Sequence, residues 1–544
     1  MSRASRFPSQ SVVDLIMSCR NIHEKNPFCV LHRVESGRTG VPPQQPTLHE
    51  VELGRTEVVL QCVNPDFLVS FRIDYRFEEE QHYCLRCFSE TASEEVSLKK
   101  HDFLGGFYFS MGQLVGAVGN SLAVPLTADS YVLIRAEPTK DSSEVLRFQL
   151  CASKLKKDGF FCQKYKNPFY IIKGLGPDRK TWETLWQSPA VIKNQNPVWD
   201  IDEVSMQKLC NGDYNHMVRI QIMHSRSEGN PQDVGGVVMS VHELLSVPNT
   251  FDIMRPTRNG ENKPAGTLSV VTADILKRPT MVDYITGGCE ISLMVAVDFT
   301  LSNGPPNDPN SLHFKGAKPN EYQQAIAKIG GIVENYASNR SFPIWGFGAK
   351  INHVKQDCLP LSGNKPGVEG LLDAYEKAFE IPGFDLSGPT NFMPVLRAAA
   401  KKAEANQRQR KQCYSFLVIL TDGVIADMEQ TSDMICRISE TVPLSIVIIG
   451  VGKADFRKME QLDSDDGILR DSTGLPAERD IVQFVPYRKY ATNVDKLAAE
   501  VLYEIPKQLV GYYQSRNIKP MAPVPMPPFR TEDIVGRNDV ETKP

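Results

Sequence analysis

Two acidic side chains and three hydroxyls stand near the ends of apolar segments in the C-terminal half of this 544-residue chain. The run "SLMVAVD" ends in Asp298, and the run "LVILT" is followed by Asp422. A buried parallel strand reads as a continuous apolar run, and ligand sites of open α/β sheets lie just beyond the carboxyl ends of strands. Five side chains are therefore candidates to meet at one edge of a sheet: Asp298, Thr300, Ser302, Thr390 and Asp422.

These side chains offer only hard oxygen donors, which suit Mg²⁺ or Mn²⁺ rather than zinc. Mg²⁺ dehydrates reluctantly, so a sparse site with bound water and one open position suits it. A carboxylate of a partner protein can then fill the open position. The simpler interpretation, that Asp298 only caps the next helix, becomes less favoured because Thr390 and Thr421-Asp422-Gly423 follow in order.

A third interpretation uses Asp298 and Asp422 as the paired carboxylates of a phosphatase or nuclease. No histidine or lysine with an obvious partner role joins them. Other enzymes built on an α/β sheet lack their signatures in this chain: there is no Gly-x-Gly-x-x-Gly, no Gly-x-x-x-x-Gly-Lys-Ser/Thr and no Gly-x-Ser-x-Gly. The sequence thus argues against a dinucleotide-binding enzyme, a P-loop nucleotidase and a serine hydrolase.

The elements that must position the five side chains follow from the hydrophobic pattern. From about residue 280, apolar runs alternate with amphipathic helical stretches, which predicts a doubly wound, mostly parallel α/β sheet. Before that, short alternating segments broken by polar or Gly/Pro turns predict β-sandwiches. We divide the chain into a first β module at 1–142, a second at 143–275, the α/β domain at 280–515, and a Pro-rich flexible tail at 516–544.

A weak internal repeat supports two β modules. The segments "RTEVVLQCVNPDF" (55–67) and "SPAVIKNQNPVWDI" (188–201) each predict a β-branched strand followed by Asn-Pro and an aromatic residue. Each module also ends in an acid-apolar-Gly element, "HDFLGG" at 101–106 and "QDVGG" at 232–236.

Composition sets limits on compartment and partners. The 12 cysteines show no disulfide-scaffold spacing, which indicates a reducing, cytoplasmic environment. The Cys-x-x-Cys pair Cys84 and Cys87 falls in a probable strand and is interpreted as coincidence, because a lone pair cannot fill a four-ligand zinc site. A net charge of −4 predicts no general affinity for nucleic acid. We expect no membrane-spanning segment, no signal segment, and, because residue 2 is Ser, no myristoylation.

Together these features resemble the copine family, in which two C2 domains precede a von Willebrand factor A domain. The similarity runs in family order across about 230 residues, through "MVDYITGGCEISLMVAVDFTLSNG", "SLHF", "FPIWGFGAKI", "GPTNFMPVL", "LTDGVIADMEQT", "LSIVIIGVGKADFRKMEQLDSDDGILR", "RDIVQFVPYR" and "EIPKQLVGYY". By this resemblance Asp298, Thr300, Ser302, Thr390 and Asp422 form a metal-ion-dependent adhesion site.

The resemblance implies a non-enzymatic adaptor. Copines bind phospholipid in a Ca²⁺-dependent way, move from the cytosol to the plasma membrane, and recruit partner proteins through the A domain. Related plant ubiquitin ligases add a zinc-binding RING after the A domain. Here the last cysteine is Cys436, so we expect no such activity.

The calcium loops depart from the family pattern. Ca²⁺ prefers six to eight oxygen ligands, several of them carboxylates, and the family supplies Ser-Asp-Pro and Asp-x-Asp loops. Only Asp102 and Asp233 remain at ligand positions, so we expect both modules to be Ca²⁺-weak or Ca²⁺-blind. The segments at the other loop positions are Lys25-Asn26-Pro27, Ser89-Glu90-Thr91, Lys166-Asn167-Pro168 and Ser225-Arg226-Ser227.

A basic segment of the second module offers another contact to an anionic phospholipid membrane. Its lysines surround Phe160 and Phe161, and each basic side chain near an anionic leaflet contributes about 1 kcal/mol. The lysines are Lys154, Lys156, Lys157, Lys164 and Lys166. The alternative is a solvated loop over a core that contains both phenylalanines. In that case the chain is a cytosolic scaffold whose C2 modules bind proteins.

Overall fold

The computed structural model describes most of the chain. The described ranges are 11–23, 26–36, 48–91, 97–127, 129–139, 143–155, 167–175, 181–225, 231–256, 261–337, 340–409, 412–423, 425–463 and 468–525. The second β module forms one compact unit by itself, and the first module packs with the α/β domain into another.

The first module is a sandwich of two four-stranded antiparallel sheets with orders β4-β1-β8-β7 and β3-β2-β5-β6. Alternating apolar side chains of both sheets fill its core, as the burial pattern of β4 illustrates with every second residue buried. The elements are β1 (Ser11–Arg20), β2 (Pro27–Ser36), β3 (Leu48–Arg55), β4 (Phe71–Tyr75), β5 (His82–Ser89), β6 (Asp102–Ser110), α1 (Met111–Gly116), β7 (Ser121–Pro125) and β8 (Tyr131–Pro138).

The second module repeats this plan strand by strand. Its strands follow the order β11-β10-β13-β14-β15-β16-β9-β12, so that β9 takes the place of β1, β10 that of β2, and so on to β16. Its separate core includes the fully buried Tyr170 and Trp199. The elements are β9 (Glu144–Ser153), β10 (Asn167–Leu175), β11 (Trp182–Gln187), β12 (Asp202–Ser205), α2 (Met206–Cys210), β13 (Met217–Ser225), β14 (Gln232–Ser240), α3 (Val241–Leu245), β15 (Asn249–Pro256) and β16 (Asn262–Lys277).

The repeated segments at 55–67 and 188–201 are not the strands that their β-branched residues predict. Apart from Arg55, the last residue of β3, both segments are irregular connections. They nevertheless make the same backbone contacts. The Phe67 amide donates to Met17 at 3.1 Å, and the Trp199 amide donates to Leu150 at 3.1 Å. The repeat therefore marks equivalent connections of two equivalent sandwiches.

Both acid-apolar-Gly elements contain a β-bulge, and this bulge shows which residues of the two elements are equivalent. Gly105 and Gly235 both have a positive φ, +150° and +142°, and each sits beside the register shift of its strand pair. Counted from these glycines, the residue equivalent to Asp102 is Gln232, not Asp233. Because successive residues of a strand face opposite sides of the sheet, the two aspartates do not occupy matching positions.

The C-terminal domain has a six-stranded sheet with order β21-β18-β17-β23-β24-β25, parallel except for β21. The strands are β17 (Glu290–Asp298), β18 (Ile344–Phe347), β21 (Leu359–Leu361), β23 (Cys413–Thr421), β24 (Leu444–Gly450) and β25 (Val482–Pro486), and a small sheet holds β19 (Ala349–Ile351), β20 (Val354–Gln356) and β22 (Phe384–Leu386). The helices are α4 (Met281–Thr286), η4 (Leu301–Asn303), α5 (Glu321–Val333), η5 (Glu334–Tyr336), α6 (Gly367–Ala378), α7 (Met393–Arg408), α8 (Met428–Thr441), α9 (Arg457–Glu460), η7 (Tyr487–Lys489), α10 (Val494–Leu502) and α11 (Ile505–Ser515).

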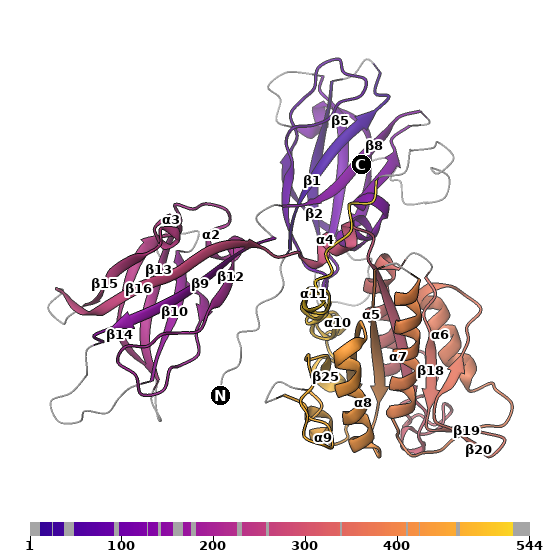
Figure 1. The fold of residues 1–544 in the computed structure, drawn as a ribbon. Coiled ribbons are helices and arrows are strands. Elements are labelled where there is room, and N and C mark those ends of the chain that lie inside the picture. The colour runs from indigo at the N-terminus through magenta and orange to yellow at the C-terminus, as the bar shows by residue number, and fades with distance from the viewer. Residues whose placement is uncertain are drawn as a thin grey trace. The chain divides into compact units, whose positions relative to one another are not determined.

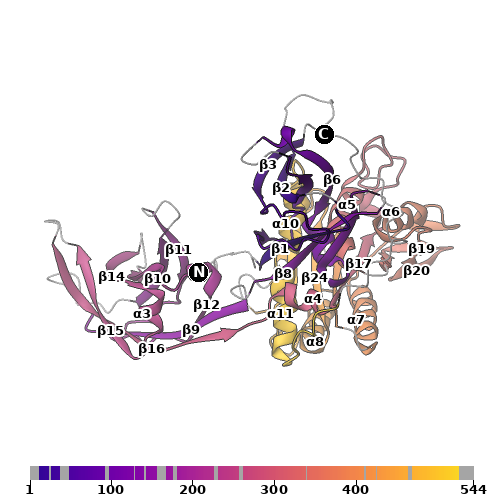
Figure 2. The ribbon, with the colours of Figure 1, turned by 90° about the horizontal axis from the view of Figure 1, so that it is seen from above.

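Helices cover both faces of this sheet, as Figures 1 and 2 show. Alternate residues of β17 divide between two cores: Val295 and Val297 pack in the core with α5, α6 and α10, whereas Met294 and Ala296 pack in the core with α7 and α8. Strand β23 is buried at all nine positions, which explains its continuous apolar run. The predicted fold class, two β-sandwiches followed by a doubly wound α/β domain, is confirmed.

The first module contacts the α/β domain through α5 and the 3₁₀ turn after it. The Phe77 ring lies 5.0 Å from the Tyr336 ring, and the hydroxyls of Tyr75 and Tyr336 are hydrogen bonded. The Lys328 ammonium of α5 lies 2.6 Å from the Glu80 carboxylate. The His82 and Lys328 side chains beside Glu80 outweigh the effect of its burial and lower its pKa to about 2.

Part of the predicted flexible tail packs against the α/β domain. The Tyr284 hydroxyl donates to the Ile518 carbonyl at 2.8 Å, and the Val524 amide donates to Thr286 at 3.0 Å. Residues 526–544 lie outside the described residues. None of the helices described is long and apolar enough to cross a bilayer.

We predict that Gly116→Ala loosens the contact between α1 and the turn at 334–336. A Cβ at Gly116 would overlap the backbone carbonyl of Asn335, and such overpacking costs about 1–3 kcal/mol. Hydrogen exchange of the full chain should accelerate at both segments. The control is Gly112→Ala, whose Cβ meets only side-chain atoms of Asn335 and Tyr336, at 3.0 and 3.2 Å. Equal exchange in the two variants would contradict the prediction.

Candidate metal-binding site

The two acidic residues follow neighbouring parallel strands. Asp298 is the last residue of β17, and Thr421, just before Asp422, is the last residue of β23. The two strands pair in parallel with Val297 opposite Leu420, so their carboxyl ends lie side by side. Thr300 and Ser302 lie at the start of the connection after β17, where η4 begins.

Hydrogen bonds join the two acids to the hydroxyls between them. The Thr421 hydroxyl donates to Asp298 Oδ2 at 2.6 Å, and the Thr300 amide donates to Asp298 Oδ1 at 2.9 Å. The Ser302 hydroxyl donates to Asp422 Oδ1 at 3.0 Å, and that of Thr300 lies 3.4 Å from the same oxygen. Four of the five predicted residues therefore form one connected group.

The fifth, Thr390, comes from the loop before α7. A Cβ at Gly423 would lie 3.9 Å from Thr390 Oγ1, so the Thr390 hydroxyl borders the loop that carries Asp422. Asp427 holds this arrangement because its carboxylate accepts hydrogen bonds from the amides of Phe392 and Met393, at 3.0 and 2.9 Å. The same carboxylate satisfies free amides at the beginning of α7. All five predicted residues thus lie on three adjoining loops.

The two carboxylates are buried, and among the described residues neither has a cationic partner. Asp298 is 0% exposed and Asp422 7% exposed. Burial, with Asp422 nearby, raises the pKa of Asp298 to about 6, and burial also raises the pKa of Asp422. In the described part of the chain no Lys, Arg or His forms an ion pair with either acid. Two buried carboxylates with hydroxyl neighbours fit a divalent cation, which supplies the missing charge.

The site opens to solvent on the side of η4. Ser302 is exposed, whereas Thr300 and Thr390 are buried at 5% and 9% exposure. Beside Ser302 stands Leu301, a large apolar side chain that is 70% exposed. An incoming group can therefore reach the oxygens from this side and meet an apolar neighbour.

Two buried polar residues that position the site were not identified from the sequence. Asn303 Nδ2 donates to the carbonyl and hydroxyl oxygens of Thr300, at 3.3 and 3.2 Å. His313 Nε2 lies 3.0 Å from the Asp298 carbonyl, and its Nδ1 lies 2.8 Å from the Tyr375 hydroxyl. Burial lowers the pKa of His313 to about 4, so the ring is neutral, with Nε2 donating to the carbonyl. Both residues lie in runs that resemble the copine family, "MVDYITGGCEISLMVAVDFTLSNG" and "SLHF", which is the sequence signal that could have identified them.

The two remaining calcium-loop candidates, one in each sandwich, differ in exposure and in hydrogen bonding. Asp102 is exposed, whereas Asp233 accepts hydrogen bonds from Gln221 Nε2 at 2.7 Å and from the Gly235 amide at 2.9 Å. Asn26 and Asn167, which the sequence comparison above predicts at calcium-loop positions, use their side-chain oxygens to accept backbone amides at 3.0 and 2.9 Å. Within the described ranges, no three carboxylates converge on either sandwich.

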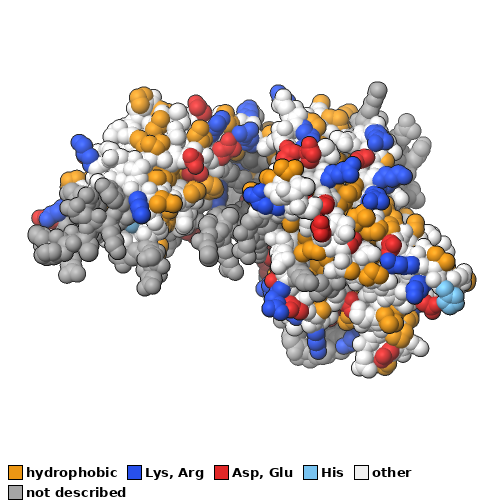
Figure 3. Space-filling model, turned by 60° about the horizontal axis from the view of Figure 1, so that its bottom comes forward, with side chains coloured by type: hydrophobic (Ala, Val, Ile, Leu, Met, Phe, Trp, Pro, Cys, Tyr) orange, Lys and Arg blue, Asp and Glu red, His pale blue; other side chains and the backbone are white. Residues whose placement is uncertain are grey.

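The predicted lysine cluster lies mostly outside the described residues. Lys154 is described and exposed, whereas Lys156, Lys157, Lys164, Lys166 and both phenylalanines are not described. On the face of the molecule in Figure 3, Lys and Arg side chains are interspersed with Asp and Glu, and neither sign covers a broad continuous area.

Comparison with known proteins identifies both kinds of domain. The copine family model matches residues 311–521, and the C2 domain model matches residues 15–126 and 146–253. The chain is similar to Copine-A of Dictyostelium discoideum, with 32% identity over 533 residues that cover 94% of this chain and 86% of that protein.

Solved structures resemble parts of the chain. The two calcium-bound C2 domains of extended-synaptotagmin 2 match 50% of this chain and 100% of that chain, at 12% identity and a TM-score of 0.22. The manganese-loaded TRAP protein of Plasmodium vivax matches 39% of this chain and 74% of that chain, at 14% identity and a TM-score of 0.26.

We predict that the contribution of Asp298 to the stability of the metal-free protein falls as the pH rises from about 4 to 6. Folded Asp298 keeps its proton to about pH 6, whereas an aspartate of the unfolded chain loses it near 3.9. Over this interval Asp298 binds fewer protons in the unfolded state, so its contribution to the free energy of unfolding falls by about 3 kcal/mol.

Denaturant unfolding in EDTA measures this effect, and Asp298→Asn should flatten it. Asp385→Asn, at an exposed carboxylate of β22, is the control and should leave it unchanged. Identical pH profiles for the wild type and Asp298→Asn would show that Asp298 does not retain its proton.

Proposed function

Because the chain belongs to the copine family, we propose that it is a non-enzymatic, peripheral membrane adaptor that recruits partner proteins through its metal-dependent A domain. The observation that carries the proposal is the pair of buried carboxylates, Asp298 and Asp422, joined by hydroxyls and lacking an ion-pair partner among the described residues. A divalent cation completes such a group.

The cation is Mg²⁺ or Mn²⁺, held by the five oxygen-bearing side chains named from the sequence. Asp298, Thr300, Ser302, Thr390 and Asp422 hold it directly or through water. Each hydroxyl offers a neutral oxygen, so the two carboxylates supply all the protein's negative charge at the site. A carboxylate from a partner protein balances the ion further and occupies the open side. Exposed Leu301 beside Ser302 gives that partner an apolar contact.

Membrane association depends on charge more than on Ca²⁺. The side chains of Asn26 and Asn167 are engaged in loop hydrogen bonds, which supports weak or absent Ca²⁺ binding at those positions. The basic segment that includes exposed Lys154 supplies the attraction to an anionic leaflet. On this proposal the protein is cytoplasmic and peripheral at the plasma membrane.

The second candidate is a cytosolic scaffold whose C2 modules bind neither calcium nor lipid. The observations that support weak Ca²⁺ binding also support this candidate. The side chains of Asn26 and Asn167 are already hydrogen bonded, and among the described residues no three carboxylates converge on either sandwich. The two candidates differ in whether the chain binds vesicles at all.

We predict that Asp298→Ala removes Mg²⁺-dependent binding of partner proteins. Loss of one of two carboxylates should weaken metal binding by at least tenfold, since a hydrogen bond or contact involving a charged group contributes about 1.5–3 kcal/mol. Isothermal titration with Mn²⁺ measures the metal site directly. Pull-down in Mg²⁺ and in EDTA then measures partner binding.

The matched control is Asp385→Ala, an exposed aspartate of the same domain. Its metal and partner binding should equal those of the wild type. Partner binding that persists in Asp298→Ala or in EDTA would refute a metal-dependent site.

We predict that the full chain pellets with phosphatidylserine-containing vesicles in EGTA and is released by salt. Replacement of Lys154, Lys156, Lys157, Lys164 and Lys166 by Gln should abolish most pelleting, because each lysine contributes about 1 kcal/mol. Phosphatidylcholine vesicles are the control. Pelleting only with Ca²⁺ would contradict the weak-calcium interpretation, and no pelleting under any condition would establish the scaffold instead.

A further inference from the structure

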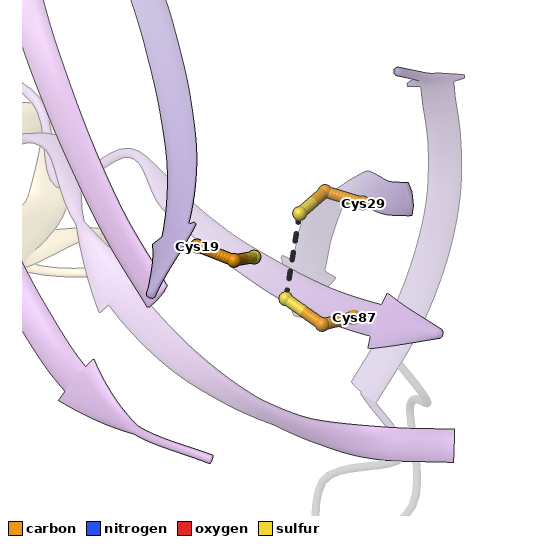
Figure 4. Close-up of side chains that lie close together, drawn as sticks. All are labelled: Cys19, Cys29 and Cys87. Carbon is orange, nitrogen blue, oxygen red and sulfur yellow. Dashed lines mark hydrogen bonds between the residues drawn. The ribbon is translucent and has the colours of Figure 1, made fainter. Parts of the chain in front are cut away.

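Three buried cysteines meet in the core of the first sandwich. Cys19 comes from β1, Cys29 from β2 and Cys87 from β5, and each is 0% exposed. The Sγ atoms of Cys29 and Cys87 are 3.4 Å apart, and all three sulfurs lie within 4.8 Å of one another. Figure 4 shows the three side chains directed toward one another. The cluster joins both sheets, because β1 belongs to one and β2 and β5 to the other.

Strand register explains this convergence. Cys29 lies directly opposite Cys87 in the antiparallel β2–β5 pair. The Cys29 amide and carbonyl both bond to Thr56, each at 2.9 Å, so toward β5 this is a non-hydrogen-bonded pair, in which side chains lie closer together. Cys84 is three residues before Cys87 and therefore faces the other side of its sheet. The Cys-x-x-Cys spacing noted in the sequence is thus not the relevant pair.

The second sandwich shows that the fold does not require cysteine at these places. Its equivalents follow from matching contacts: Ala152 donates to Pro197 as Cys19 donates to Pro65, and Tyr170 bonds Ser188 as Cys29 bonds Thr56. Tyr170 lies opposite Ile222, as Cys29 lies opposite Cys87. An alanine, a tyrosine and an isoleucine therefore stand where the first sandwich has three thiols. The equivalent scaffold packs with ordinary side chains, so packing alone does not account for the sulfurs.

We propose that Cys19, Cys29 and Cys87 form a three-sulfur site for a monovalent soft metal ion, Cu(I). Thiolates select soft ions such as Cu(I) and zinc. Sulfurs about 2.3 Å from an ion, at the corners of a triangle around it, lie about 4 Å apart. The observed sulfur separations, from 3.4 Å to at most 4.8 Å, bracket that value.

The surroundings favour Cu(I) over zinc. Zinc sites in proteins are almost always four-coordinate, and no fourth His, Cys, Asp or Glu belongs to this cluster in the described part of the chain. The neighbouring core side chains are apolar. Because buried net charge is costly, a monovalent ion in this core is balanced by one thiolate and two thiols. The absence of a fourth ligand among the described residues, rather than charge, separates Cu(I) from zinc.

Metal binding couples to proton release, because a cysteine that ligates a metal ion is deprotonated. Each thiolate that forms when Cu(I) binds therefore releases one proton to solvent. The bound ion ties the two sheets together near the ends of β1 and β5 and the beginning of β2.

Anaerobic titration of the reduced full chain with Cu(I) tests the proposal. The ion is supplied from a coloured Cu(I) chelator, and copper retained per chain is measured by its bleaching. The site variants are Cys19→Ala, which places the residue of the second sandwich at this position, and Cys87→Ser, which keeps the side-chain size. The matched control is Cys84→Ala, at a cysteine of the same strand that is also buried, at 1% exposure.

The wild type and Cys84→Ala should each retain one more equivalent of copper than Cys19→Ala and Cys87→Ser. X-ray absorption of the copper-loaded wild type should show three sulfur neighbours. Equal retention by the wild type and Cys19→Ala overturns the proposal. So does preferential retention of Zn²⁺ when both ions are supplied. Fewer than three sulfur neighbours would also overturn it, and this measurement needs no variant.

Discussion

The α/β domain is organised around the placement of two carboxylates where water cannot solvate them. Asp298 is the last residue of β17 and Asp422 follows β23, the two central strands of the sheet. Burial raises the pKa of both residues. Such groups persist in a fold only when hydrogen bonds or a cation offset the desolvation. Thr421 and Ser302 provide the hydrogen bonds. The surrounding polar residues thus hold the carboxylate oxygens in fixed positions.

The sequence identified the acids because strand ends can be recognised locally. A continuous apolar run followed by Asp predicts both burial and position, and parallel pairing of β17 with β23 brings the two ends together. Asn303 and His313 could not be found in this way. The importance of His313 depends on its contact with the Asp298 carbonyl, which arises only when the connection after β17 folds back. No local pattern encodes that path.

The β modules show where local patterns mislead. The β-branched residues at 56–59 predict a strand, yet the segment is irregular in the structure. Two hydrogen bonds join Thr56 to Cys29, and one joins the Val59 amide to Pro27. The spacing from the acid to the first glycine differs by one residue between "HDFLGG" and "QDVGG". The bulge shared by Gly105 and Gly235 shows that the glycines, not the aspartates, are equivalent. The cysteine cluster was hidden because its members lie far apart in the chain and share no motif.

Helix α5 and the turn after it contact both the connection after β17 and the first sandwich. Near its beginning, the Tyr322 hydroxyl donates to Asn303 at 2.6 Å, and Asn303 in turn holds Thr300. Just beyond its end, Tyr336 meets the first sandwich through Tyr75. Thirteen helical residues span about 20 Å, so α5 fixes the distance between the loop that carries Thr300 and the contact with the first sandwich.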